Sequence, residues 1–154
     1  MAVDAPIELL PALPTALPPV ERRAAIPAGF AAGGASVGIK ASGRPDLAVI
    51  AAARARVAGP NAHAPLAAAA VFTPNAFAAA PVRLSGAHLA ASDPAGGGRF
   101  GWAAGVVSTS GCANAATGAP GDADQAAVAG YLAATLGVEP AAILCLSTGV
   151  IGTR

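Results

Sequence analysis

The residues that could do the most specific chemistry in this chain are Ser147, Thr148 and Gly149. They directly follow an apolar run, residues 141–146, whose composition is typical of a buried strand. At the end of such a strand, the Thr148 hydroxyl and the Gly149 N–H group could form an oxyanion hole, donating hydrogen bonds to the oxygen of a reacting carbonyl. The alternative is a plain strand-to-loop turn. Spacing alone favours the turn, because short Ser-Thr-Gly strings are common.

An oxyanion hole is only half of a catalytic site, because acyl transfer also needs an activated nucleophile. The sequence has no Gly-x-Ser-x-Gly element that would carry one. We therefore expect the nucleophile to lie beyond Arg154, and we interpret the chain as one component of an enzyme.

A second candidate segment, residues 108–118, combines hydroxyl side chains, Asn114 and two glycines behind an apolar strand. Such small residues allow a ligand or another chain to approach the backbone closely. The competing interpretation is a loop whose Ser, Thr and Asn side chains cap the helix that follows. Composition alone does not favour one over the other.

Other candidate sites fail on their spacing. Gly33 and Gly38 are spaced as in a phosphate-binding loop, but Ile39 stands where that loop requires lysine. His63 and His88 have no carboxylate and nucleophile nearby, so we expect ordinary surface histidines. We predict no metal site and no bound cofactor.

The two cysteines, Cys112 and Cys145, lie among apolar or small residues without the spacing of metal ligands. We expect both to be buried free thiols. Cys112 has no basic neighbour that would lower its pKa, which argues against a reactive thiol.

The composition narrows the class of protein. The chain has 154 residues, of which 55% are hydrophobic and 11% charged, and its formal net charge is +1. Ordinary globular domains are about 25% charged, so nothing here favours binding to nucleic acid or to an anionic membrane. Because alanine dominates the apolar residues, we expect a thin core and a partner chain that covers one face. No apolar run is long enough to span a membrane and the N-terminus lacks secretory features, so we expect a cytoplasmic protein.

The chain divides into two parts. Residues 1–25 carry five prolines, and we predict that they form a disordered lead-in. Residues 26–154 are predicted to form a single domain. Within the domain, a turn at residues 42–45 predicts a hairpin between its two flanking strands. The predicted strands cover residues 35–40, 46–51, 67–73 and 102–108, and a last strand leads into Ser147.

Two helices are predicted among these strands. Pro81 is predicted to be the first residue of a short helix that carries Val82, Leu84 and Leu89. A longer helix begins after Gly121, where Asp122 can cap it together with Gln125 three residues further on, and ends at Gly137. Its predicted apolar stripe consists of Val128, Tyr131, Leu132 and Leu136. Because helices and strands alternate and hairpins also occur, we predict an α+β fold with layered mixed sheets.

Six blocks of sequence, taken in order, resemble one known family. The two most specific are Ser-Gly-x-Ala-Asn-Ala-x-Thr-Gly at residues 110–118 and Leu-Ser-Thr-Gly-Val-Ile-Gly at residues 146–152. They are similar to the N-terminal, or α-chain, part of the ornithine acetyltransferase family, the bifunctional glutamate N-acetyltransferases of arginine biosynthesis. The resemblance extends from about residue 26 to Arg154.

The resemblance implies a specific chemistry. Family members are precursors that cleave themselves before a threonine, which becomes the N-terminal nucleophile of a β-chain. An acetyl group passes from N-acetylornithine to this threonine and then to glutamate, and bifunctional members also accept acetyl-CoA as the donor substrate. By this resemblance Thr148 and Gly149 form the oxyanion hole. It also implies an α2β2 heterotetramer and a layered mixed-sheet sandwich of the self-cleaving N-terminal-threonine type.

The chain departs from the family pattern at several positions. Thr109 and Cys112 replace asparagines, and Ala116 replaces a cysteine. No threonine has the family's cleavage-site context, so the nucleophile and the main substrate-binding residues are absent. We therefore expect an incomplete α-chain part that is inactive alone: a truncated precursor, a fragmentary gene or an incomplete sequence. The alternatives are part of a related self-cleaving aminopeptidase and a small noncatalytic domain that packs on a partner.

Overall fold

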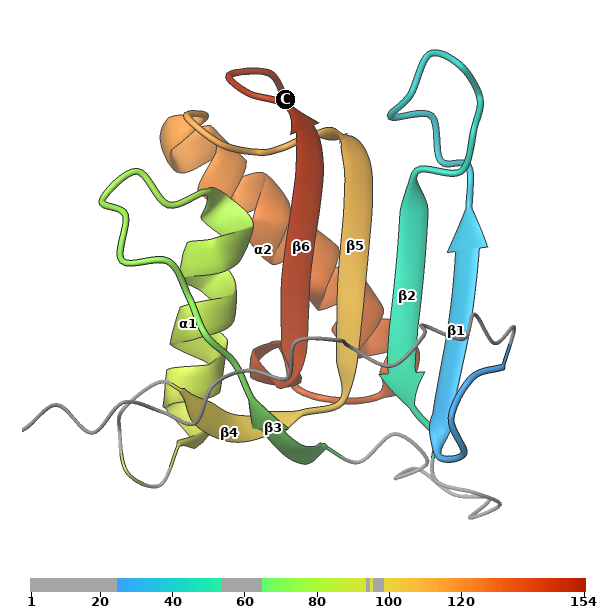
Figure 1. Cartoon of the computed structure of the whole chain (residues 1–154), viewed down its shortest axis with the longest axis vertical. Coiled ribbons are helices and arrows are strands. Elements are labelled where there is room, and N and C mark those ends of the chain that lie inside the picture. Colours follow the sequence, from blue (N-terminus) through green and yellow to red (C-terminus); the bar gives the residue numbers. More distant parts are fainter. Residues whose placement is uncertain (1–24, 54–64, 94, 96–98) are drawn as a thin grey trace, which may run out of the picture.

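The structure of the chain is a computed structural model that describes residues 25–53, 65–93, 95 and 99–154. The predicted lead-in, residues 1–25, and His63 therefore fall outside the described residues, apart from Ala25. The described residues form six strands, two α-helices and a short 3-10 helix (Figure 1). In chain order they are β1 (Phe30–Ala35), β2 (Leu47–Ala52), β3 (Leu66–Ala69), α1 (Ala80–Ser92), β4 (Phe100–Ala103), β5 (Gly105–Cys112), α2 (Gly118–Leu136), η1 (Pro140–Ala142) and β6 (Ile143–Val150).

The strands form two sheets. The larger sheet has the order β1-β2-β5-β6, and β3 and β4 form a separate two-stranded antiparallel sheet. In the larger sheet β1 pairs antiparallel with β2, and β2 with β5, whereas β5 and β6 are parallel. A parallel pair needs a long crossover connection, and α2 supplies it. The predicted α+β class with a mixed sheet is confirmed.

The helices lie on one side of the larger sheet and along its edge. Figure 1 shows α2 behind the sheet and α1 beside β6, the edge strand. At that edge the Ser85 hydroxyl of α1 accepts the Cys145 N–H at 2.8 Å and donates to the Cys145 carbonyl at 3.0 Å. Helix α1 therefore satisfies backbone groups that would otherwise lie on an open strand edge.

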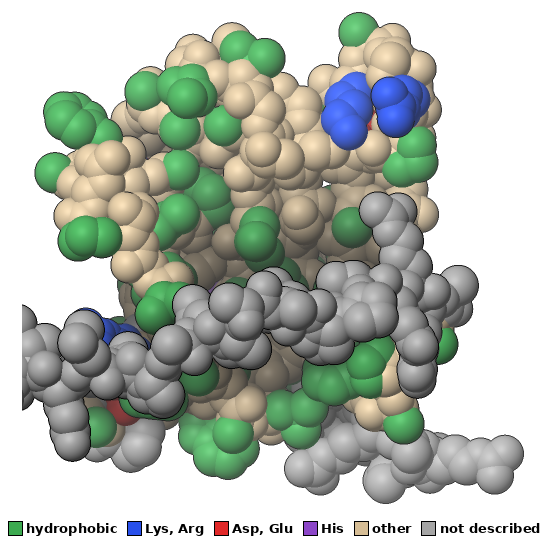
Figure 2. Space-filling model, in the orientation of Figure 1, with side chains coloured by type: hydrophobic (Ala, Val, Ile, Leu, Met, Phe, Trp, Pro, Cys, Tyr) green, Lys and Arg blue, Asp and Glu red, His purple; other side chains and the backbone are tan. Residues whose placement is uncertain are grey.

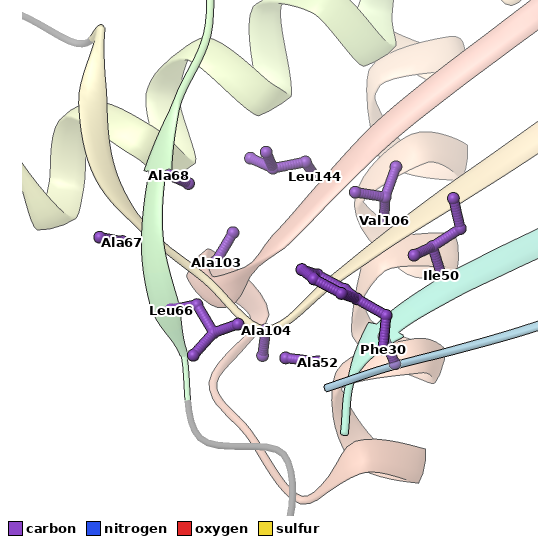
Figure 3. A pocket seen from close by; sticks show the side chains of 12 residues that line it. Phe30, Ile50, Ala52, Leu66, Ala67, Ala68, Ala103, Ala104, Val106 and Leu144 are labelled. Atoms are coloured by element: carbon purple, nitrogen blue, oxygen red, sulfur yellow. The ribbon is translucent and has the colours of Figure 1, made fainter. Parts of the chain in front are cut away.

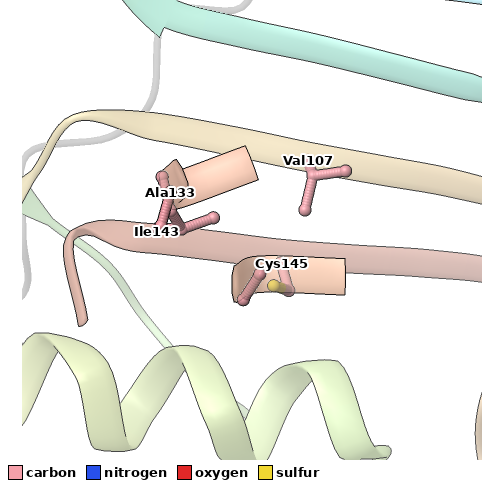
Figure 4. Packing of buried hydrophobic residues seen from close by; sticks show 5 residues of the cluster. Val107, Ala133, Ile143 and Cys145 are labelled. Atoms are coloured by element: carbon pink, nitrogen blue, oxygen red, sulfur yellow. The ribbon is translucent and has the colours of Figure 1, made fainter. Parts of the chain in front are cut away.

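The core lies between α2 and the strands β5 and β6. Val107, Ile143 and Cys145 from the strands pack against Ala129 and Ala133 of α2 (Figure 4). Alternate strand residues reach the helix because side chains on a strand point to opposite faces in turn. Most of the buried apolar residues in the described part of the chain are alanines, so the predicted alanine-rich core is confirmed.

The predicted stripe on the longer helix is only partly right. Val128, Leu132 and Leu136 are partly buried beside the core. The fully buried positions, such as Ala129 and Ala133, come one residue later in the sequence. Tyr131 is 76% exposed. The buried face follows the spacing Gly121, Gln125, Ala129 and Ala133, all small residues except one. Aromatic character at position 131 is therefore a misleading signal.

Both helix termini can be compared with the prediction. The C-terminus is right, because Gly137 adopts a left-handed conformation with φ 66° at the end of α2. The N-terminus is wrong, because α2 begins at Gly118 rather than after Gly121. Thr117 occupies the N-cap position, but its hydroxyl donates to Asn114 Oδ1 at 2.7 Å and makes no capping hydrogen bond. For α1, Pro81 lies in the first turn, but the helix begins one residue before the predicted start, at Ala80.

Three predicted strands need correction. The hairpin exists, but its first strand is β1, residues 30–35, because residues 36–45 form a loop around the Asp46 carboxylate. The predicted strand 67–73 ends at Ala69. The predicted strand 102–108 is two strands in different sheets, separated at Ala104, whose N–H bonds to the Ala142 carbonyl at 2.7 Å. A continuous apolar run gives no sign of such a change of sheet.

The face of the larger sheet opposite α2 carries exposed apolar side chains. Ile50 is 49% exposed and Leu146 52% exposed, and Phe30 is also exposed. Figure 2 views this face and shows hydrophobic side chains on it. Among the described helices, none is long and apolar enough to cross a membrane.

Candidate functional site

Thr148 and Gly149 lie near the C-terminal end of β6. In the parallel pairing with β5, Thr148 is beside Ser110 and Gly149 is beside Gly111. Ile143 and Cys145 are buried toward α2, so the alternation of strand side chains directs Thr148 to the opposite, open face. Thr148 is exposed, and its hydroxyl has no hydrogen-bond partner among the residues that the structure describes.

The Gly149 N–H group points away from β5. Alternate residues of a strand direct their backbone groups to the same edge. Cys145 bonds to Ser85 of α1 on the outer edge, and the Val150 carbonyl accepts the Ala113 N–H at 2.9 Å on the β5 side. Gly149 therefore faces the outer edge, where no described residue accepts its N–H. The Thr148 hydroxyl and the Gly149 N–H, here called the donor pair, are free at one corner of the sheet.

Gly149 also makes an unusually close backbone contact. A Cβ atom added there would lie 2.3 Å from the carbonyl carbon of Gly111 and 2.7 Å from the Cys112 nitrogen. The φ angle of Gly149 is 137°, which L side chains rarely adopt. No other residue fits this position without moving the backbone. The close approach that the small residues of segment 108–118 predicted therefore occurs between two strands of the same sheet.

A polar network lies behind the donor pair, on the α2 side. The hydroxyls of Thr109 and Ser147 are 2.8 Å apart, and the Ser147 hydroxyl donates to Gln125 Oε1 at 3.2 Å. Gln125 also accepts a hydrogen bond from the Asn114 side-chain amide at 3.2 Å. Gln125 is 3% exposed and Asn114 is 8% exposed, whereas Thr109 and Ser147 are half-buried, so the network is buried at its α2 end. It fixes the residue immediately before Thr148 to helix α2.

Asn114 shapes the loop that leads into α2. Its φ angle is 47°, in the left-handed region that asparagine tolerates better than most residues. Its side-chain amide donates to the Gly121 carbonyl at 2.8 Å. Ser108 and Ser110 lie on the same face as Thr148, whereas Thr109 and Asn114 face inward and link β5 and the loop after it to Ser147 and α2. They do not make the simple N-terminal cap that was one of the two predictions.

Sequence reasoning missed Gln125 as part of this network. It treated Gln125 only as a partner of the predicted cap at Asp122. The usable signal was the spacing of Gln125 with Gly121, Ala129 and Ala133, which places a polar side chain in the middle of a small-residue helix face. A buried glutamine needs partners, and Ser147 and Asn114 provide them.

The histidine and cysteines have structural contacts. His88 is half-buried, with Nδ1 2.7 Å from the Ile143 carbonyl oxygen, so the expectation of an ordinary surface histidine is wrong. Both cysteines are free thiols as predicted, but only Cys145 is fully buried, and burial raises its pKa. Cys112 is half-buried and donates to the Thr153 carbonyl at 2.9 Å.

Two apolar cavities lie along β6. A cavity of about 180 Å³ between the two sheets is lined by Phe30, Ile50, Leu66 and Leu144 (Figure 3). It lies at the N-terminal end of β6, away from the donor pair. A second cavity of about 460 Å³ runs beside residues 144–147, against residues 70–73 and the first turns of α1. The second cavity is the one that leads toward Thr148.

The described residues supply donors but lack the other parts of a catalytic site. Among them there is no group of three or more His, Cys, Asp or Glu side chains that could hold a metal ion. Arg154 binds the Asp124 carboxylate at 2.7 and 2.9 Å and lowers the pKa of that carboxyl. This exposed ion pair leaves neither group as a free base. In chemical terms, the two free donors at this corner are suited to hydrogen-bond a negatively charged oxygen atom.

The fold and this corner define a class: a layered α+β protein with a mixed sheet and a pair of free hydrogen-bond donors at the end of a parallel strand. The comparison with family models identifies the class more closely. Residues 31–154 match the model of the ArgJ family, and the chain belongs to that family. The resemblance found in the sequence is confirmed.

Curated relatives support the assignment. The chain is 40% identical over 130 residues to the mitochondrial arginine biosynthesis bifunctional protein ArgJ of Aspergillus niger, and 42% identical over 130 residues to that of Podospora anserina. It is 40% identical over 124 residues to ArgJ of Thermosynechococcus vestitus. These matches cover 83%, 83% and 80% of this chain. The chain spans only about a quarter of the length of these relatives, 25%, 24% and 25% respectively.

Two solved structures share the fold. The arginine biosynthesis bifunctional protein ArgJ of Bacillus halodurans matches with a TM-score of 0.66 and 30% identity, over 82% of this chain and 56% of that one. The ornithine acetyltransferase of Mycobacterium tuberculosis, solved in complex with ornithine, matches with a TM-score of 0.68 and 38% identity, over 83% of this chain and 60% of that one. The predicted layered fold, incomplete in this chain, is confirmed.

Proposed function

We propose that this chain is the N-terminal part of an acetyltransferase of arginine biosynthesis. The complete enzyme transfers an acetyl group from N-acetylornithine to glutamate, with acetyl-CoA as a further possible donor substrate and no bound cofactor. The observation that carries the proposal is the donor pair, free at the corner of a sheet in an ArgJ-family chain. The names of the relatives, which include an ornithine acetyltransferase bound to ornithine, support the substrate class.

The donor pair stabilises the transition states of both transfer steps. In the first step a threonine oxygen attacks the acetyl carbon of N-acetylornithine, the amide C–N bond breaks, and the ornithine amine leaves with the proton. In the second, the glutamate amine attacks the acetyl-threonine ester, releases the threonine hydroxyl and forms N-acetylglutamate. Each attack places negative charge on the acetyl oxygen, where the Thr148 hydroxyl and the Gly149 N–H would donate. One such donor contributes about 3 kcal/mol of transition-state stabilisation.

The nucleophilic threonine belongs to a β-chain that the precursor releases by self-cleavage, and we propose an α2β2 assembly. The open sheet face supports a covering partner, because Ile50 and Leu146 are each about half exposed there. Contiguous apolar surface of this kind marks interaction sites in soluble proteins. The cytoplasmic location expected from the sequence is also a proposal, since the fungal relatives are named as mitochondrial.

The test is to co-express this chain with the remaining part of the ArgJ protein of Thermosynechococcus vestitus and to measure ornithine release from N-acetylornithine. Release that depends on glutamate is expected. In the active complex, Thr148→Ala should lower kcat about 10²-fold. Thr135→Ala is the matched control, because that hydroxyl is exposed and donates only to the Tyr131 carbonyl of its own helix. An unchanged kcat in Thr148→Ala would refute the oxyanion assignment.

Hydrolysis that does not depend on glutamate would distinguish a self-cleaving aminopeptidase from the proposed acetyltransferase. If the complex cleaves amino-acid amides and releases no ornithine from N-acetylornithine, the aminopeptidase alternative is correct. A complex with neither activity would contradict the proposed acetyl transfer.

A further inference from the structure

Asp46 holds the loop that joins β1 to β2. Its carboxylate accepts the Val37 N–H at 2.7 Å on one oxygen and the Lys40 N–H at 2.8 Å on the other. The residue is only 3% exposed. The Val37 hydrogen bond, followed by that of Lys40, lowers the pKa of the carboxyl, so the ionised form is favoured. The ionised Asp46 carboxylate therefore holds the loop closed by accepting two backbone hydrogen bonds.

This loop packs closely against β5, the strand paired with the strand that carries the donor pair. A Cβ atom added to Gly111 would lie 2.8 Å from Cγ2 of Ile39 and 3.2 Å from Cγ of Lys40. A Cβ atom added to Gly149 would lie 2.3 Å from the carbonyl carbon of Gly111. The loop, β5 and β6 are thus stacked with no space for a methyl group at either glycine. We therefore expect a displacement of the loop to change the position of Gly149.

The main chain of Asp46 reaches the same place. Its carbonyl accepts the Ser110 N–H at 2.8 Å, which extends the pairing of β2 with β5 beyond Leu47. Ser110 is the neighbour of Thr148 in the β5–β6 register. One residue therefore fixes the loop through its side chain and strand β5 through its backbone, both at the level of the donor pair.

We propose that Asp46 is a positioning residue for the donor pair. It contacts neither Thr148 nor Gly149, and it acts through Ile39, Lys40 and Gly111. When its carboxylate is intact, the loop keeps Gly111 against Gly149 and so fixes the direction of the Gly149 N–H. The catalytic importance of that direction rests on the proposed function, whereas the positioning itself does not.

The first test uses the ¹⁵N-labelled 154-residue chain and the variant Asp46→Asn. Asparagine keeps the shape, but its NH₂ group opposes one of the two N–H donors. Amide exchange at Val37 and Lys40 should become at least about tenfold faster, and the amide resonances of Gly111 and Gly149 should shift. Asp122→Asn is the control, because it removes the same charge from a carboxylate that binds Arg83. It should leave the glycine resonances in place.

A second variant tests the other link in the same path. Ile39→Ala removes the side chain that meets Gly111 from a residue that is 40% exposed, so the fold should persist. It should shift the Gly111 and Gly149 resonances while exchange at Val37 and Lys40 stays close to that of the parent. If the Gly149 resonance is unchanged in both variants, Asp46 does not act on the donor pair and the proposal is overturned.

Activity of the co-expressed complex separates this proposal from the proposed function. Asp46→Asn should lower kcat at least about tenfold with little change in KM for N-acetylornithine, because donors displaced by a fraction of an ångström still bind substrate but stabilise the transition state poorly. If the parent complex is active and Asp46→Asn keeps the parent kcat, the positioning proposal fails. If the parent complex is inactive but the glycine resonances shift as expected, the proposed function fails and the positioning proposal stands.

Discussion

The two ends of the β5–β6 pair are built differently. At the buried end, Val107, Ile143 and Cys145 pack against the alanines of α2. At the polar end, Ser147, Thr148 and Gly149 are held by hydrogen bonds to β5 and α2 and by direct backbone contact. The same two strands thus change from side-chain packing to polar and backbone contacts within a few residues.

The difference shows how a strand can present free donors at a fixed place. Apolar packing around Thr148 and Gly149 would cover the donor groups that we propose contact the substrate. The polar end leaves these groups uncovered, because its contacts lie elsewhere. Gln125 of α2 accepts a hydrogen bond from Ser147, and the Gly111 backbone of β5 packs against Gly149. The buried end supplies the free energy of folding that the polar end does not, since burial of apolar surface is the main favourable contribution to folding.

The largest effect should follow a substitution at the buried end. Ile143 is 0% exposed, so Ile143→Ala removes buried methyl and methylene groups and leaves a cavity. We expect a loss of about 4 kcal/mol in the free energy of unfolding, measured by urea denaturation of the chain. For a small domain, a loss of this size approaches its entire stability.

Leu146→Ala is the control for this prediction on the same strand. It removes a side chain of equal size that is 52% exposed on the open face. A loss below about 1 kcal/mol is expected in the chain alone, because little apolar surface is buried there. Equal losses in the two variants would contradict the division between a buried end and a polar end.

A smaller effect is expected at the polar end, for Gly149→Ala. The added methyl group would meet the Gly111 backbone at 2.3 Å, and alanine disfavours the φ of 137°. Overpacking and backbone strain together should cost about 3 kcal/mol in the free energy of unfolding. Gly152→Ala is the matched control, with a φ of 81° but nothing within 4 Å of the added Cβ. This control measures the backbone strain alone. If Gly152→Ala lost as much free energy of unfolding as Gly149→Ala, the close contact between Gly149 and Gly111 would be unimportant.

The sequence predicted the parts of this comparison that depend on local pattern. The apolar run before Ser147 indicated a strand, Pro81 indicated the first turn of α1, and Gly137 marked the end of α2. Each of these signals arises from the conformational limits of one residue type or from strand periodicity. The role of Thr148 and Gly149 was predicted only through the family resemblance, and it remains a prediction.

The parts that the sequence did not reveal depend on contacts between distant residues. Residues 36–40 were predicted as part of a strand, because nothing local shows that Asp46 accepts the Val37 and Lys40 N–H groups. The change of sheet at Ala104 depends on a hydrogen bond to Ala142. Gln125 is part of the network only because Asn114, in the loop after β5, and Ser147 of β6 donate hydrogen bonds to it. Local propensity cannot encode such pairings, which are fixed when the elements pack.

The smallest effect is expected at the exposed ion pair just beyond the polar end. Arg154 binds Asp124 of α2 and lowers the pKa of that carboxyl in the folded state. A lowered folded-state pKa means that the pair stabilises the fold above the ordinary carboxyl pKa, and that the stabilisation disappears as the pH falls below about 4. Asp124→Asn should therefore lower the unfolding midpoint slightly at pH 7 in low salt. The difference from the parent should shrink steadily as the pH falls below about 4, and it should vanish in 1 M salt, where exposed pairs are screened. A difference that grew as the pH fell would have the wrong sign for this pair and would remove it from the contacts that support the polar end.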